Sequence, residues 1–497
     1  MKRILEYSLV FLSAFLMGLS QHPIGLGFLA YIALIPMIPI LVSLKSYKRA
    51  TVISFFWGFL YNLITVYWIA FNIGTSPEIA FLTMILTVLI LTTGPLFAFL
   101  VWCQLNKRGV SLYLFSFIWP SIELLRSYGS LGFPWTSFAN SQLDYYLIIQ
   151  NAEFVGMYGI TFWIVLVNLL LFKMFTNRSW NHVFYLLAVV ILPFIFGKVI
   201  LNSNYQESSI DSVRVASVQP NIHLSEKRKP GAQKKIISTI VSQSSEILNS
   251  KIDLLVWPET STISYILQNN KYGYKKIKDM LASYNTKLIA GIPYYERNAN
   301  SVNYYNSAAY FNSSGLIGLY HKINLVPGAE YIPLSHYVNS LDVLNFGQGN
   351  FAHGYDYTIF DISKYKFGTM ICLESTFPYL SREFVNKGAN FLVYVVNDGW
   401  YETPPEPQQH SKRAIYRAIE TRRPIIRCAN TGISMIIDEL GNIKHKLELN
   451  KKGVILANIY PKDRITFYVR YGDIFIYFMM LIIILHMFKP IRYEEYV

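Results

Sequence analysis

The sequence has 497 residues, of which 53% are hydrophobic and only 15% charged. Soluble domains carry about 25% charged residues, so this composition excludes an ordinary soluble protein and predicts a membrane protein. The net charge of +14 would suit a nucleic-acid-binding protein. However, most lysines and arginines of the N-terminal part lie in short connections between apolar runs, as membrane topology requires. We therefore expect no nucleic-acid partner.

Seven apolar runs fill the N-terminal part of the sequence, and an eighth run lies near its C-terminal end. Each has close to the ~20 residues that a helix needs to cross a bilayer. Basic residues precede the first run, as in a secretory signal peptide, but no clear small-residue cleavage site follows it, so we expect an uncleaved span. The predicted spans cover residues 4–20, 25–44, 52–73, 79–104, 110–126, 155–175, 182–201 and 472–488.

Basic residues gather on every second connection, whereas the loops near 21–24, 74–78 and 127–152 contain no lysine or arginine. The positive-inside rule then predicts cytoplasmic termini and places the segment between the last two spans outside. Arg126 and Lys198, at the outer ends of two spans, run against this orientation. The basic residues that favour it are Lys2, Arg3, Lys45, Lys48, Arg49, Lys107, Arg108, Lys173, Arg178, Lys489 and Arg492.

The segment 205–465 alternates β-rich apolar runs with polar helical stretches, which predicts an α/β domain. We therefore expect a transmembrane bundle at 1–204, the α/β domain at 205–465, and a final span with a tail at 466–497. The polar stretch Asn202–Asp211 is the predicted linker. Predicted strands are 213–218, 253–257, 287–292, 307–311, 316–321, 367–371, 391–396, 425–429, 434–437 and 453–458, and predicted helices are 231–249, 271–284, 378–387 and 408–422.

The sequence contains three cysteines, Cys103, Cys372 and Cys428, which are far apart and form no CxxC pair. This spacing argues against a disulfide framework and against a zinc site. No P-loop, GxGxxG, GxSxG or HExxH motif occurs. We therefore expect no metal and no nucleotide cofactor, while the possibility of a single catalytic thiol stays open.

Three residues follow apolar runs and carry groups capable of catalysis. Glu259 comes after a run that ends in Pro258, where a scaffold can fix a catalytic carboxylate, although many such glutamates are merely solvated. Lys322 lies among apolar residues and could stabilise an oxyanion, or its ammonium could simply reach water. Cys372 ends an apolar run, where backbone N–H groups could stabilise a thiolate, or it could be an inert buried thiol.

In this order and with these neighbours, Glu259, Lys322 and Cys372 resemble the Glu-Lys-Cys triad of the nitrilase superfamily. The resemblance extends over most of residues 213–458. It includes Tyr394–Trp400, which is similar to the strand and loop that follow the nucleophile in that family. The resemblance implies an αββα sandwich for the α/β domain.

A nitrilase-type domain inserted before the last of eight spans resembles the apolipoprotein N-acyltransferase family. The resemblance covers essentially the whole chain. The segments that carry it are Leu131–Trp135, Tyr320–Pro333, Asn397–Trp400, Gln409–His410, Arg417–Glu420 and Arg423–Arg427.

This resemblance implies a two-step acyl transfer in the bacterial cytoplasmic membrane, with the catalytic domain on the extracytoplasmic side. A membrane phospholipid would give its acyl chain to Cys372 as a thioester. The N-terminal α-amine of a diacylglyceryl-cysteine on a lipoprotein would then accept it. Glu259 would be the general base, and Lys322 would stabilise the oxyanion. The resemblance further implies that Glu330 positions Lys322 and that Glu374 supports the Cys372 loop.

Three further residues are candidate substrate contacts, and two of them have an alternative role. Trp135, in a predicted outer loop, could contact substrate or anchor the loop at the membrane interface. Trp400 belongs to the segment after the nucleophile. His410 begins a polar helical stretch, where it could contact substrate or serve as a capping or surface residue.

The sequence departs from the family pattern at two places. Leu373 follows the nucleophile where the family often has tyrosine, and Arg228 lies near the place of an expected tryptophan. Both changes concern substrate contacts. Two other functions stay open: a membrane-anchored amidase that uses the same triad with water, and a transporter or receptor with a vestigial outer domain. The shortage of ionisable residues inside the spans argues against a transporter.

Overall fold

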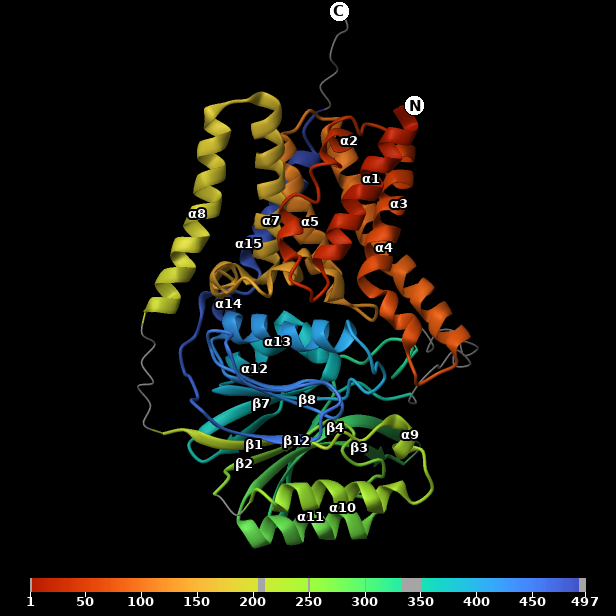
Figure 1. Ribbon diagram of the computed structural model, residues 1–497, viewed down its shortest axis with the longest axis vertical. Helices are drawn as coiled ribbons and strands as arrows, with labels where there is room; N and C mark the ends of the chain where they lie inside the picture. The colour runs from red at the N-terminus through yellow and green to blue at the C-terminus, as the bar shows by residue number, and fades with distance from the viewer. Residues whose placement is uncertain (1, 204–210, 249–250, 300, 333–349, 491–497) are drawn as a thin grey trace, which may run out of the picture. The chain divides into compact units, whose positions relative to one another are not determined.

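The computed structural model describes residues 2–203, 211–248, 251–299, 301–332 and 350–490 (Figure 1). The chain divides into a membrane unit, residues 1–71, 80–203 and 471–497, and an α/β unit, residues 72–79 and 204–470. The boundary predicted at 204/205, most of the stretch Asn202–Asp211, and Arg492 lie outside the described residues.

The membrane unit is helical. Five of its described helices are long and apolar enough to cross a bilayer, because their sequences are hydrophobic all round, with only isolated charges. These five are α1 (Lys2–Ser20), α3 (Tyr47–Val66) continued by η2 (Tyr67–Phe71), α4 (Pro77–Asn106), α7 (Ala152–Asn177) and α8 (Trp180–Asn202). Shorter elements are η1 (Gly27–Tyr31), α2 (Ile38–Val42), η3 (Leu112–Leu114), α5 (Phe115–Leu125), η4 (Pro134–Thr136), η5 (Phe138–Gln142), α6 (Tyr146–Ile149) and α15 (Ile474–Met487).

The run 25–44 does not form the continuous helix that its hydrophobicity predicts. It folds as η1 and α2, joined by turns. Pro36 and Pro39 lack the backbone N–H that a helix interior needs, and Gly25 adopts a φ of 79°. The predicted spans at 110–126 and 472–488 correspond to shorter apolar helices, Leu112–Leu125 and Ile474–Met487.

The α/β unit contains two six-stranded sheets. Their inner strands are parallel and almost completely buried, which explains the Val-, Ile- and Leu-rich runs of the sequence. The strands are β1 (Val213–Gln219), β2 (Leu254–Trp257), β3 (Lys287–Arg297), β4 (Val302–Asn312), β5 (Gly315–His321), β6 (Ile359–Ile362), β7 (Tyr365–Ile371), β8 (Phe391–Val396), β9 (Ile425–Ala429), β10 (Ser434–Ile437), β11 (Ile443–Leu447) and β12 (Gly453–Ile459). The first sheet has the order β12-β1-β2-β3-β4-β5 and the second the order β11-β10-β9-β8-β7-β6.

The two sheets pack face to face, with β1 against β9 and β4 against β7. Helices α10 (Ala232–Ser245) and α11 (Lys271–Tyr284) cover the outer face of the first sheet, and α12 (Pro378–Asn386) and α13 (Glu406–Thr421) cover that of the second (Figure 1). The α/β unit is therefore the αββα sandwich that the family resemblance implies. Two short helices complete it, α9 (Leu224–Lys227) and α14 (Phe467–Tyr471), the last residue of which belongs to the membrane unit.

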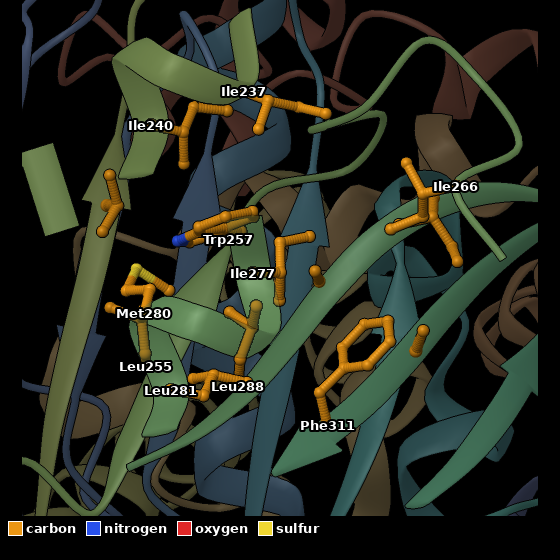
Figure 2. Packing of buried hydrophobic residues seen from close by; sticks show 14 of the residues in the cluster. Ile237, Ile240, Leu255, Trp257, Ile266, Ile277, Met280, Leu281, Leu288 and Phe311 are labelled. Carbon is orange, nitrogen blue, oxygen red and sulfur yellow. The ribbon is translucent and has the colours of Figure 1, made fainter. Parts of the chain in front are cut away.

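Figure 2 shows the core between the first sheet and its helices. The apolar side chains of α10 and α11 recur at helical spacing and face those of the strands. Each large side chain that is fully buried stabilises the fold by about 1.5–3 kcal/mol. The labelled residues are Ile237, Ile240, Leu255, Trp257, Ile266, Ile277, Met280, Leu281, Leu288 and Phe311.

Candidate active site

The predicted triad follows the carboxyl ends of three strands. Glu259 comes after β2, Lys322 after β5 and Cys372 after β7. The fold brings them together: Lys322 Nζ lies 3.5 Å from Glu259 Oε1, and the Cys372 thiol hydrogen-bonds the Glu259 carboxyl group. Glu259 is 4% exposed and Lys322 only 1%, whereas Cys372 is partly exposed. A nucleophile, a base and a fixed cation therefore share one largely buried site, which suits covalent catalysis.

Lys322 is held by a second carboxylate. Its Nζ lies 2.9 Å from Glu330 Oε1, and the backbone N–H of Val326 donates to Glu330 Oε2 at 2.8 Å. Burial lowers the pKa of Lys322, but Glu330 and Glu259 outweigh burial and raise it above its usual value. Lys322 is therefore a permanent cation that cannot act as a base near neutral pH.

Asn306, on β4, was missed by the sequence analysis. Its Nδ2 donates to Glu259 Oε1 at 2.7 Å and to Glu330 Oε1 at 2.8 Å, so one amide fixes both carboxylates. The predicted strand began only at Ser307. The signal that could have found Asn306 is an asparagine, a poor strand former, directly before the predicted strand.

Cys372 adopts a left-handed backbone conformation, with φ at 53°. It begins the 3-10 helix η7 (Cys372–Thr376) directly after β7, so its side chain stands at a sharp strand-to-helix turn. A non-glycine residue in this region costs about 1–3 kcal/mol and persists only where the surroundings enforce it. Burial raises the pKa of the Cys372 thiol well above its usual value; Glu259 raises it further and Lys322 opposes this. The thiol is therefore neutral at pH 7.

Glu374 contacts the turn from one side. Its Oε2 accepts from the backbone N–H of Ile371 at 2.8 Å. Its Oε1 accepts from the hydroxyl of Tyr320 at 2.8 Å and from the N–H groups of Ile323 and Asn324 at 2.7 and 3.0 Å. This buried carboxyl therefore ties the Cys372 turn to the segment after β5 that carries Lys322.

His410, at the start of α13, enforces the turn from the other side. Its Nε2 lies 3.2 Å from the Cys372 carbonyl oxygen and 3.1 Å from Ser375 Oγ. Its Nδ1 lies 2.7 Å from Asp398 Oδ1, and Arg427 donates to Asp398 Oδ2 at 2.9 Å. His410 is only 2% exposed, so its position fits a role in the turn better than the predicted substrate contact.

Cys372, Asp398 and His410 are also the one cluster of described residues with the ligand types and spacing of a metal site, their atoms lying within 4.8 Å of one another. The donor set does not suit a metal. Asp398 already pairs with both Arg427 and His410, and a guanidinium 2.9 Å from a ligand oxygen would repel a cation.

Trp400 follows β8 and is partly exposed. Its carbonyl accepts from the backbone N–H of Ile73 at 3.0 Å, and Tyr401 bonds Asn72 at 3.2 Å. A Cβ on Gly74 would lie 2.4 Å from the Trp400 ring. Only glycine allows this close approach, so Trp400 is packed under the segment Asn72–Ile79 of the α/β unit.

Trp135 lies in η4 of the membrane unit and is 2% exposed. Its ring stacks on Phe133 at 5.4 Å and lies 5.0 Å from that of Trp68. The following residues are anchored by buried Glu123, which accepts from the N–H of Phe138 at 2.9 Å and from Ser137 Oγ at 2.5 Å. Trp135 therefore packs inside this unit.

Two family profiles match the chain. One, described as carbon-nitrogen hydrolase, matches residues 214–466, and the other, described as the apolipoprotein N-acyltransferase N-terminal domain, matches residues 13–170. The first covers the α/β unit with all the predicted triad residues. The second covers most of the membrane unit.

Curated relatives match almost the whole chain. The apolipoprotein N-acyltransferase of Geobacter metallireducens is 30% identical over 484 residues, which cover 95% of this chain and 92% of that protein. The apolipoprotein N-acyltransferase of Thermotoga maritima is 28% identical over 495 residues, covering 96% and 92%. That of Chlorobaculum tepidum is 28% identical over 447 residues, covering 84% and 83%. The resemblance found in the sequence is confirmed: this chain is a membrane acyltransferase that belongs to the apolipoprotein N-acyltransferase family.

Proposed function

We propose that this chain transfers an acyl chain from a membrane phospholipid to the N-terminal α-amine of a diacylglyceryl-cysteine on a lipoprotein, through a thioester on Cys372. Family membership supplies the reaction class. The buried contacts of Glu259 with Lys322 and Cys372 carry the mechanism. Glu259 is the base, Lys322 stabilises the oxyanion, and Glu330 positions Lys322.

In the first half-reaction, the neutral thiol loses its proton to Glu259 while Sγ bonds to the ester carbonyl carbon. The Lys322 ammonium and backbone N–H groups of the Cys372 turn stabilise the oxyanion. The carbonyl then re-forms and the ester C–O bond breaks. The lysophospholipid oxygen takes the proton from Glu259, and the acyl group stays on Cys372.

In the second half-reaction, the neutral α-amine attacks the thioester carbonyl. The C–N bond forms, the C–S bond breaks, and the surplus proton of the amine returns through Glu259 to Sγ. An α-amine has a pKa of about 7.7–8, so a useful fraction is neutral at pH 7. Limited water access protects the thioester until the amine arrives.

The proposed spans, domain limits and membrane orientation are those expected from the sequence. We propose eight spans, domain limits at 1–204, 205–465 and 466–497, and an extracytoplasmic α/β unit in the bacterial cytoplasmic membrane. Trp135 and Trp400 stay proposed substrate contacts. His410 is instead assigned to holding the Cys372 turn.

Intact mass spectrometry of the purified full chain tests the proposal. Incubation with phosphatidylethanolamine in mixed detergent micelles should add one acyl mass to the wild type and none to Cys372→Ala. A synthetic diacylglyceryl-cysteine peptide should then discharge the adduct and gain the same acyl mass. Absence of an adduct with every phospholipid tried would overturn the donor half. Discharge by water alone, with no acylated peptide, would overturn the acceptor half and favour an amidase.

A further inference from the structure

Lys227, at the end of α9, lies beside the proposed base. Its Nζ donates to the backbone carbonyl of Thr260 at 3.0 Å, one residue after Glu259. Thr260 adopts a left-handed backbone conformation, with φ at 51°. The Lys227 ammonium thus reaches the active site from an element outside the predicted triad.

Lys227 has no anionic partner in contact within the described part of the chain. Its neighbour Glu226 pairs instead with Lys235 at 3.7 Å. Lys227 is partly buried, and burial lowers its pKa to about 8, against the Glu259 carboxylate, which raises it. A partly buried ammonium without an anionic partner is stabilised when an anion binds it through charge-assisted hydrogen bonds.

Arg228 adds a second cation next to Lys227. Its Nη2 donates to the Gly74 carbonyl at 2.9 Å, and the residue is exposed. Gly74 lies three residues after η2 ends at Phe71 and three before α4 begins at Pro77. A connection this short between two spans stays in the interfacial layer of the bilayer, where lipid phosphates lie.

We propose that Lys227 and Arg228 form a phosphodiester-binding site for the acyl donor. This inference rests on the proposed function and names what the active site recognises besides the ester. The phosphate of a glycerophospholipid is separated from its ester carbons only by the glycerol. Lys227 beside Glu259, together with its chain neighbour Arg228, therefore selects donors that carry a phosphate and holds their ester near Cys372. The guanidinium of Arg228, which stands near the place of the tryptophan expected from the family, is a second hydrogen-bond donor to that phosphate.

The test compares two acyl donors with the same chain. One is phosphatidylethanolamine, and the other is a p-nitrophenyl acyl ester, which has no phosphate. The initial rate of acyl addition to Cys372 is measured by intact mass for the full-length wild type, Lys227→Met and Lys227→Arg. In Lys227→Met, the phospholipid rate should fall about tenfold further than the neutral-ester rate, because a charge-assisted hydrogen bond is lost with one donor only. Lys227→Arg should restore most of the difference.

Lys229→Met is the matched control, since it removes an exposed lysine two residues away. It should leave the ratio of the two rates at the wild-type value. Arg228→Gln should lower the ratio less than Lys227→Met does, because Arg228 is more exposed and more screened.

Equal loss with both donors in Lys227→Met would overturn the inference, because the lysine would then act through Glu259. No loss with either donor would overturn it as well, because the lysine would then contribute nothing to the binding of the donor. Failure of the proposed function gives a different result: the wild type would gain an acyl group from the neutral ester and none from any phospholipid.

Discussion

The thiol of Cys372 and the carboxyl of Glu259 face each other with Lys322 on the same carboxyl group. A carboxylate next to a thiol disfavours the thiolate, so it raises the thiol pKa, whereas an ammonium lowers it. The balance here raises the pKa of Cys372. In the proposed mechanism, Glu259 is therefore expected to take a proton during attack and not to stabilise a resting thiolate.

Glu259→Gln separates these two effects. Removing the negative charge should lower the pKa of Cys372, so the pH profile of its alkylation by iodoacetamide should move to lower pH. Acyl transfer from phospholipid should nevertheless fall by about 100-fold or more, because the general base is gone. The pKa of Cys372 is measured by alkylation that is quenched at set times and quantified by intact mass spectrometry. The rate of acyl transfer is measured by acyl addition to Cys372.

Lys322→Met is the opposing control for this pair of measurements. Loss of the ammonium should raise the pKa of Cys372 and move the alkylation profile to higher pH. Cys103 and Cys428 are both 0% exposed, so they add little background. A Glu259→Gln profile that moves to higher pH would contradict the assigned charge balance.

At the scale of elements, the Cys372 turn is held between helix α13 and the segment after β5. Glu374 bonds that segment, and His410 of α13 lies against the Cys372 carbonyl and Ser375. The left-handed backbone of Cys372 thus depends on two separate elements. Loss of either should displace the sulfur from Glu259, which matters because a displacement of about 1 Å can cost about 100-fold in rate.

His410→Ala and His410→Gln test the α13 side of the turn. Alanine removes the contact, so acyl addition to Cys372 should fall by about 10- to 100-fold. Glutamine can again reach the carbonyl or the hydroxyl and should recover most of the rate. His22→Ala is the matched control, because it removes an imidazole contact of 2.9 Å to the carbonyl of Ile64 in the membrane unit.

The rates should be read beside the unfolding temperature of each variant. A purely structural role would lower the unfolding temperature and the rate together, and glutamine would then rescue both or neither. If His410→Ala gains acyl groups at the wild-type rate, α13 does not position the nucleophile.

The elements that the sequence predicts best are those with one strong pattern. The buried parallel strands read as continuous apolar runs, so β8 was predicted with its observed limits, 391–396. β11 and β6 were missed, because Ile443–Leu447 is largely exposed and rich in lysine and histidine, and Ile359–Ile362 has only four residues. Local patterns cannot show pairing to a distant partner, which is what makes these segments strands.

The residues of the site divide in the same way, into those in a local sequence motif and those that depend on distant contacts. Glu259, Lys322 and Cys372 stand in motifs that local sequence displays, and whether they are the catalytic residues stays a prediction. Asn306 and Lys227 stand in no local motif. Their places in the site depend on contacts with Glu259, 47 positions from Asn306, and with Thr260, 33 positions from Lys227. Sequence order alone does not reveal such contacts.

At the scale of the whole molecule, the run 25–44 decides the orientation. Seven spans before the α/β unit put it on the side opposite the N-terminus, whereas six would put both on one side. A helix broken by prolines can still cross a bilayer if neighbouring groups satisfy its backbone. Asn168 bonds both the N–H of Leu34 and the carbonyl of Ala30. Trp102 donates to the carbonyl of Leu41 at 2.8 Å.

These contacts favour a crossing at 25–44, and single cysteines can test it. In a Cys372→Ala background, Lys45→Cys, Asn177→Cys and Lys251→Cys each place a thiol at an exposed position. A membrane-impermeant maleimide added to intact spheroplasts should label Lys251→Cys alone, because the positive-inside rule puts the other two positions in the cytoplasm. Detergent should then expose all three to the reagent.

If the run 25–44 does not cross, Lys45→Cys should be labelled from outside. If Lys251→Cys is then still labelled from outside, one more of the predicted spans must also fail to cross the bilayer. Labelling of Asn177→Cys with protection of Lys251→Cys would place the α/β unit in the cytoplasm. That result would contradict the proposed reaction as well as the topology, because a cytoplasmic active site could not reach a diacylglyceryl-cysteine on the outer surface of the membrane.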